Sequence, residues 1–144
     1  MNKFLFPRYA NERTFSAFLL AFRVLFGSLM LYHGLTKMLD YSYLVAGYAD
    51  PIGIGSEATL MLTIFAEFFC SIFFITGCLF RIFTIPMILA MAVAFFGVHR
   101  ASFELGGELA FVYMVVLIIM YASGPGQFSL DRLIDNSCKR NHQK

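Results

Sequence analysis

Two charged side chains lie in the middle of long apolar runs, where an unpaired charge is costly. They are Arg23 in the first run and Glu67 in the second. A charge at the centre of a membrane helix costs about 2.5–3.5 kcal/mol on insertion scales, so it needs a partner or a use. Counted from the ends of their runs, the two depths differ by only roughly 6 Å. We therefore expect Arg23 and Glu67 to pair, either to fix the register of two helices or to bind a proton or a ligand.

A second group of ionisable side chains stands at the ends of the apolar runs. His33 and Lys37 close the first run, His99 and Arg100 close the third, and Glu108 opens the fourth. Antiparallel packing would bring these ends to one mouth. There the side chains either snorkel to water or bind a small anionic or quinone-like ligand, with histidines that exchange protons near neutral pH. Their spacing fits no metal motif, so we expect no metal site.

The composition excludes several classes of protein. Apolar residues make up 59% of the chain and charged residues 14%, against about 45–50% and about 25% in soluble domains. The net charge of +2 is too small to indicate a nucleic-acid partner. Cys70, Cys78 and Cys138 have no CxxC spacing, and none is expected at the outer face. This argues against a disulfide framework and against a membrane thiol oxidase.

Four apolar runs must position the ionisable residues. We expect spans at about 15–37, 58–80, 82–98 and 107–123, then a polar tail, 124–144, with a short helix from Ser129. Each run approaches the roughly 20 residues that cross a bilayer. The tight junction at Arg81 predicts a hairpin of the second and third spans, with Pro86 in the first turn of the third. The sequence predicts one domain, 1–144, an all-α membrane-spanning four-helix bundle.

Helical spacing gathers small and polar residues on single faces of the first two spans. One face of the first span carries Arg23, Gly27, Met30, Gly34 and Lys37. One face of the second span carries Glu67, Cys70, Ser71, Phe74 and Cys78. Glycines let a second helix approach closely. The bundle should therefore contain a polar seam, with the remaining Phe, Leu and Ile side chains facing lipid.

Lysines and arginines are unevenly distributed between the two sides of the predicted bundle. Only Lys37 and Arg100 fall on one side. The other side carries Lys3, Arg8, Arg13, Arg81, Arg132, Lys139, Arg140 and Lys144. Cytoplasmic segments carry the excess of positive charge. We therefore expect both termini in the cytoplasm of a bacterium, the bundle in its inner membrane, and the loops 38–57 and 99–106 outside.

Several short motifs at the span ends occur together in a known order. Arg23 and Gly27 precede His33-Gly34-x-x-Lys37, and Glu67 precedes Gly77 and Arg81. The fourth span begins with Gly106-Gly107-Glu108 and is followed by Gly124-Pro125-Gly126-x-x-Ser129-Leu130-Asp131. From about Arg23 to Asp131 the chain resembles the DoxX family. One departure is Phe68-Phe69-Cys70-Ser71, where the family often has small glycine pairs.

The resemblance implies a four-helix membrane fold and a link to redox chemistry. Family members resemble small subunits of thiosulfate:quinone oxidoreductases, and others associate with enzymes of oxidative-stress defence or amine-dehydrogenase maturation. The positions that match the family pattern are Arg23, His33, Lys37, Glu67 and Glu108. The family has no agreed set of catalytic residues. The matches therefore identify equivalent positions in this chain without assigning a role to any of them.

The expected function is that of a small subunit or accessory of a membrane redox system that interacts with quinone. The sequence has no haem, flavin or iron–sulfur ligation pattern, so electrons would come from a partner enzyme, and whether this chain is itself catalytic stays open. The alternatives are a non-catalytic scaffold for an oxidoreductase and a small transporter. Besides lipid, a second copy of the chain is a candidate partner. The candidate ligand-binding residues are Arg23, His33, Lys37, Glu67, His99, Arg100 and Glu108.

Overall fold

The computed structural model describes residues 12–141, with side chains up to residue 137. Over this range the chain is helical, without strands, which confirms the predicted all-α class. The elements are α1 (Glu12–Leu39), α2 (Tyr41–Leu44), α3 (Ser56–Ile64), η1 (Phe65–Phe69), α4 (Cys70–Thr76), α5 (Phe80–Ala92), η2 (Val93–Val98), η3 (Phe103–Gly107), α6 (Glu108–Ser123) and α7 (Leu130–Asn141). The π-helical turns η1 and η2 continue a neighbouring α-helix, whereas η3 contains a kink at Gly106, whose φ is 82°.

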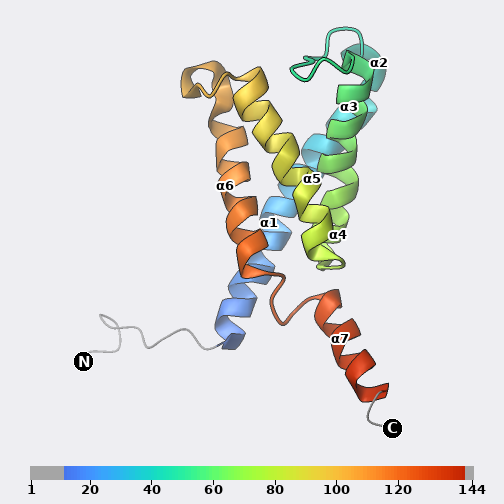
Figure 1. Ribbon diagram of the computed structural model, residues 1–144, viewed down its shortest axis with the longest axis vertical. Coiled ribbons are helices and arrows are strands. Elements are labelled where there is room, and N and C mark those ends of the chain that lie inside the picture. Colours follow the sequence, from blue (N-terminus) through green and yellow to red (C-terminus); the bar gives the residue numbers. More distant parts are fainter. Residues whose placement is uncertain (1–11, 142–144) are drawn as a thin grey trace, which may run out of the picture.

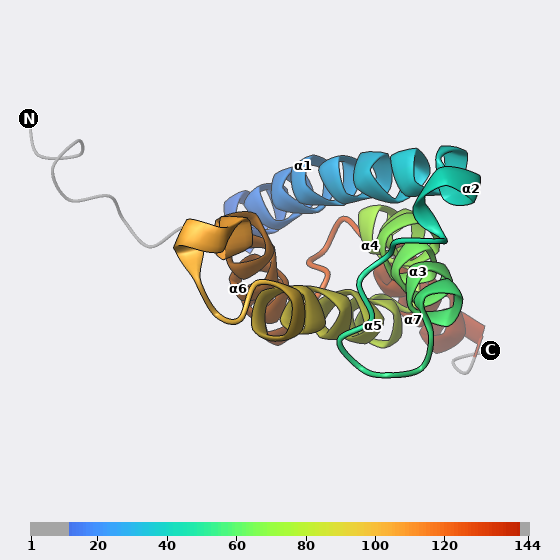
Figure 2. The same cartoon turned by 90° about the horizontal axis from the view of Figure 1, so that it is seen from above.

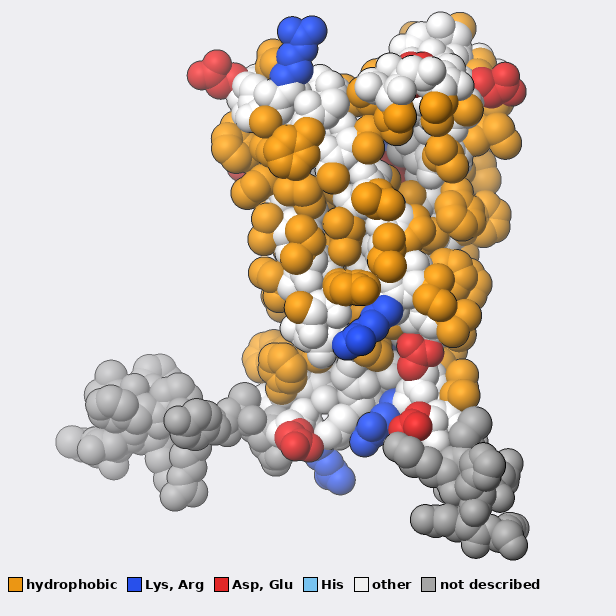
Figure 3. Space-filling view, in the orientation of Figure 1, with side chains coloured by type: hydrophobic (Ala, Val, Ile, Leu, Met, Phe, Trp, Pro, Cys, Tyr) orange, Lys and Arg blue, Asp and Glu red, His pale blue; other side chains and the backbone are white. Residues whose placement is uncertain are grey.

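Four helical segments are long and apolar enough to cross a membrane. They are Glu12–Leu39, Ser56–Thr76, Phe80–Val98 and Phe103–Ser123. Hydrophobic side chains cover the middle of the face seen in Figure 3, and the charged side chains on this face lie toward its two ends. This distribution is what a bilayer requires, because apolar side chains meet the hydrocarbon and charged ones reach the interfaces.

The four segments pack as a bundle around a buried core. Seen from above, α1 lies opposite α5, with α6 on one side and the α3–α4 segment on the other (Figure 2). The largest fully buried apolar side chains are Phe74, Phe80, Met30, Leu60 and Met87. On α1, Arg23, Gly27, Met30 and Gly34 are all buried, which confirms the predicted stripe.

The bundle has two different ends (Figure 1). We call the end that carries α2, the loop 45–55 and η3 the loop end. The opposite end, where α1 begins and α7 lies, is the terminal end. At the loop end a single carboxylate organises the loop: Asp50 accepts hydrogen bonds from the N–H groups of Gly53, Ile54 and Gly55 and from the Thr59 hydroxyl. The Gly55 N–H above all holds the pKa of Asp50 below its usual range.

At the terminal end the second and third spans are joined by the expected tight turn, but this turn lies before Arg81 and not at it. The turn between α4 and α5 lies at 77–79, and Arg81 is already inside α5. Gly77 and Leu79 both have positive φ, which closes the turn. Asp131, just inside α7, accepts hydrogen bonds from the N–H groups of Leu79 and Phe80 and so caps α5. Pro86 lies well inside α5 and not in its first turn, so it cannot donate a helical hydrogen bond there.

Candidate ligand site

An ion pair between Lys37 and Glu67 forms the centre of the candidate site. The Nζ of Lys37, in the last turn of α1, contacts Oε2 of Glu67 in η1. The Glu67 side chain is only 5% exposed, whereas that of Lys37 is 24% exposed. A carboxylate at such burial needs a charged or hydrogen-bonding partner. Lys37 supplies that partner while keeping part of its own surface accessible.

Local backbone structure places Glu67 against α1. The π-helical turn η1 widens the helix around Glu67, and the Ser71 hydroxyl donates to the Glu67 carbonyl at 2.6 Å. On the facing helix, a Cβ added to Gly34 would lie 2.5 Å from the Phe68 nitrogen and 2.7 Å from the Glu67 carbonyl carbon. The two backbones therefore touch at this level. Single π-helical turns inside α-helices occur frequently at functional sites.

The predicted pairing of Arg23 with Glu67 is wrong. Glu67 lies at the level of Gly34, which is roughly 16 Å along α1 from Arg23. Arg23 instead lies beside Gly77, at the end of the second span. The prediction failed because it placed the ends of both helices at one membrane surface. In the structure α1 extends well beyond the end of α4 at the terminal end.

Two backbone carbonyl groups accept hydrogen bonds from Arg23, whereas its buried Nε has no partner among the described residues. Its Nη1 donates to the Pro125 carbonyl oxygen and its Nη2 donates to that of Phe128, at 2.7 Å. Arg23 is 1% exposed. Gly77 has φ of +68°, and a Cβ there would lie 2.6 Å from Arg23 Nη1, so both its backbone and the space favour glycine. Arg23 thus ties the segment after α6 to the bundle.

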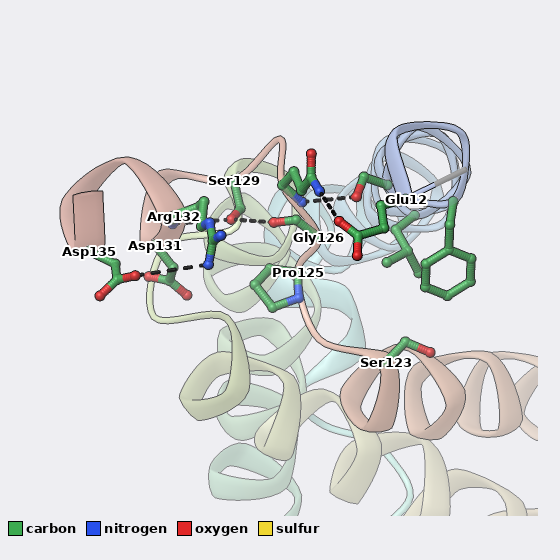
Figure 4. Close-up of a pocket in the computed structure, with 12 residues that line it drawn as sticks. Glu12, Ser123, Pro125, Gly126, Ser129, Asp131, Arg132 and Asp135 are labelled. Carbon is green, nitrogen blue, oxygen red and sulfur yellow. Dashed lines mark hydrogen bonds and ion pairs between the residues drawn. The ribbon is translucent and has the colours of Figure 1, made fainter. Parts of the chain in front are cut away.

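A pocket of about 490 Å³ lies beside this segment at the terminal end (Figure 4). The hydrogen bonds drawn in it hold the loop in place. Ser129 Oγ donates to the Gly126 carbonyl at 2.9 Å, and Gln127 bonds through its N–H to Ser16 Oγ and through its side chain to Glu12. These polar groups are engaged with one another, so we assign them to the anchoring of the loop.

At the loop end, four of the predicted residues line one cavity of about 170 Å³: His33, Lys37, Glu67 and His99. A second cavity of about 230 Å³ also has Lys37, Glu67 and His99 in its wall. We call these two spaces the head cavities. The ion pair and His99 therefore belong to a wall that both head cavities share.

The hydrogen bond of His99 indicates which of its ring nitrogens carries the proton and which can accept one. His99 Nδ1 lies 2.7 Å from the Leu105 carbonyl oxygen. A carbonyl oxygen only accepts, so Nδ1 carries the proton and Nε2 is the proton-accepting nitrogen of the neutral ring. Arg100 and Ala101 follow with φ of 51° and 54°. This left-handed turn brings Leu105 back to the histidine.

Besides Arg23, two further predicted residues lie outside the site, and several site residues were not predicted. Arg100 and Glu108 are exposed, and neither lines the head cavities. Tyr113, a buried tyrosine in α6, lines the first head cavity, and Tyr48 and Thr63 line the second. A tyrosine in the middle of an apolar span was the only sequence signal for Tyr113. Its partners depend on the packing of α6.

A model of the DoxX family matches residues 18–100, well over half of the chain, and the protein belongs to this family. With four helices of spanning length, it is a multi-pass integral membrane protein. No curated protein and no solved structure matches the chain. Across residues 12–141, no group of three or more His, Cys, Asp or Glu side chains is placed to hold a metal ion.

Proposed function

We propose that this DoxX protein is a small quinone-interacting subunit or accessory of a membrane redox system in the bacterial inner membrane. The observation that carries the proposal is the Lys37–Glu67 ion pair in the wall of two cavities that also contain His99. A buried ion pair is weak evidence for stability alone. A pair that borders open space, beside a histidine with a defined acceptor nitrogen, is suited to bind a polar head and to exchange protons.

The residues of the head cavities fit a quinone head group. Its two carbonyl oxygens need hydrogen-bond donors, which Lys37 Nζ on α1 and the Tyr113 hydroxyl on α6 could supply. When bound, a quinone takes up two electrons, which a partner enzyme would provide, and two protons. Buried donors aimed at developing negative charge stabilise it strongly, because water is largely excluded.

Proton movement would use His99 and Glu67. The Nε2 of neutral His99 can take a proton at the loop end, since the ring is only partly buried. Glu67 can hold a proton in place of its contact with Lys37, and the ammonium group would then be released toward the head cavities. The excess of Lys and Arg at the terminal end supports a cytoplasmic position for that end, and the proton-exchanging residues would then communicate with the exterior.

The test is purification in nanodiscs, lipid extraction and mass spectrometry for co-purified quinone. We expect quinone at near-stoichiometric amounts in the wild-type protein and its loss in Glu67→Gln. Arg100→Gln is the matched control, because Arg100 is exposed and lies outside the cavities. Quinone retained at wild-type levels by Glu67→Gln and by Lys37→Met would contradict the proposed site.

A scaffold for a periplasmic or membrane oxidoreductase is the second candidate. It is favoured by apolar side chains that stand exposed at the loop end, with Leu39 at 75% and Tyr43 at 88% exposure. A partner enzyme could cover them. If the purified protein contains no quinone but binds one identified oxidoreductase, and Tyr43→Ser abolishes that binding while Glu67→Gln does not, the scaffold is the correct function.

A further inference from the structure

An apolar groove of about 310 Å³ runs between the α3–η1 segment and α5–η2. Its rim consists of large side chains that stand exposed on the membrane-facing surface, with Leu62 at 56%, Phe65 at 44% and Leu89 at 58% exposure. Its wall contains no charged side chain. The exposed rim lies within helices that cross the bilayer, so the groove opens toward hydrocarbon and not toward water.

The groove adjoins the second head cavity and shares a wall with it. Thr59, Thr63, Ala90 and Val93 line both the groove and the second head cavity. Thr63 is already engaged, because its hydroxyl donates to the Thr59 carbonyl at 2.8 Å, and Thr59 donates to Asp50 at 2.9 Å. The two adjoining spaces differ in polarity: the wall of the groove has no charged side chain, whereas the wall of the second head cavity contains the Lys37–Glu67 pair.

We propose that this groove binds the apolar tail of the ligand whose head lies at the ion pair, and that the ligand enters sideways from the bilayer between the second and third spans. The occupant is the prenyl or alkyl chain of a lipid-soluble quinone. This inference rests on the proposed function for the nature of the head. The tail follows from the groove itself, since an apolar surface joined to a charged cavity matches a molecule with one apolar and one polar part.

Small residues and a proline make room for the tail. Ala66 and Ala90 lie in the wall, where larger side chains would fill the space, and Pro86 lies beside them in α5. The rim residue Leu89 is exposed, so a larger side chain there would narrow the groove without crowding the core. Because the groove opens to lipid, a bound tail gains close packing in the groove and not the removal of apolar surface from water. Filling the groove should therefore weaken the binding of a long-tailed ligand and leave a ligand without a tail unaffected.

The test compares two probes in nanodiscs, a benzoquinone with a decyl chain and the same benzoquinone without it. We expect Leu89→Trp to weaken binding of the decyl probe about tenfold or more and to leave the tailless probe unchanged. Leu25→Trp is the matched control, because Leu25 is equally exposed on α1 but lines none of these spaces. Leu62→Trp is a second blocking variant in case Leu89→Trp folds poorly, because Leu62 is exposed and lines the groove but not the head cavities.

A decyl probe with a diazirine at the end of its chain locates the tail directly. We expect crosslinks at Leu62, Phe65 or Leu89, lost when unlabelled decyl probe is in excess. Crosslinks spread evenly over the lipid-facing helices, or unchanged affinity in both blocking variants, would overturn the tail site while leaving the head site intact. A groove filled by phospholipid would give the same unchanged affinities. If wild-type protein binds neither probe, the proposed function fails and this inference fails with it.

Discussion

Two cations of α1, Arg23 and Lys37, have different surroundings. Arg23, toward the terminal end, is 1% exposed and donates to two backbone carbonyl groups. Lys37, at the loop end, contacts a carboxylate and borders two cavities. Backbone carbonyl groups do not change their protonation state, whereas a carboxylate can gain a proton and release its cationic partner. We therefore assign Arg23 to the architecture and Lys37 to ligand binding.

Glycine accompanies both cations, but it serves different contacts. Beside Arg23, Gly77 leaves room for the guanidinium group and closes a turn. Near Lys37, Gly34 lets the backbone of α1 touch the backbone of η1. The first contact could adjust through the movement of a side chain. The second contact cannot adjust without moving a helix, so the position of Glu67 depends on the packing of two spans.

The largest expected effect is on stability, from Arg23→Met. The substitution leaves the carbonyl groups of Pro125 and Phe128 without their donor in a buried place, which should lower the free energy of unfolding by about 2–5 kcal/mol. Thermal unfolding in detergent measures the loss. The affinity of the folded fraction for quinone should stay at the wild-type value. A variant with unchanged unfolding temperature and lost quinone would reverse the assignment of the two cations.

Lys37→Met should give the opposite result. It removes a charged donor from the head cavities, so quinone affinity should fall about 10- to 100-fold, the range for a hydrogen bond to a charged group. The unfolding temperature should fall less than in Arg23→Met, because Glu67 can take a proton when its partner is lost. The double variant Lys37→Met with Glu67→Gln should restore stability without restoring binding. A larger stability loss than in Arg23→Met would identify the ion pair as mainly structural.

Gly34→Ala and Gly27→Ala test how closely the site depends on helix packing. A Cβ at Gly34 meets the backbone nitrogen of Phe68 at 2.5 Å, whereas one at Gly27 meets the side chain of Ile75 at 2.4 Å. A flexible side chain can move, but backbone cannot. We expect Gly34→Ala to cost about 1–3 kcal/mol of stability and to weaken quinone binding, and Gly27→Ala to cost less and leave binding intact. Equal losses in unfolding and binding assays would remove the distinction.

The sequence predicted the bundle, the stripe on α1 and four of the residues at the head cavities. These follow from hydrophobicity and helical period, which depend only on local sequence. It could not predict the partners of Arg23 and Glu67, because these depend on how far one helix slides along another. That register is set by Gly34 against Phe68 and by the loop after α6. The exposure of Arg100 and Glu108 depends likewise on the left-handed turn after His99.

The smallest expected effect concerns the loop 45–55, in which Tyr48 and Pro51 line the second head cavity. The hydrogen bonds from Gly55 and its neighbours lower the pKa of Asp50, so they stabilise the loop while Asp50 is ionised. This contribution is present above the unfolded pKa of about 3.9 and is lost as the pH falls through the lower folded value. Amide hydrogen exchange of residues 53–55 should therefore become faster at acidic pH, after correction for intrinsic rates. Asp50→Asn should remove this pH dependence and leave the unfolding of the spans almost unchanged. If wild-type and variant loops respond alike to acid, another group controls the loop, and the loop end owes its order to the packing of Tyr48 and Pro51 on the second head cavity.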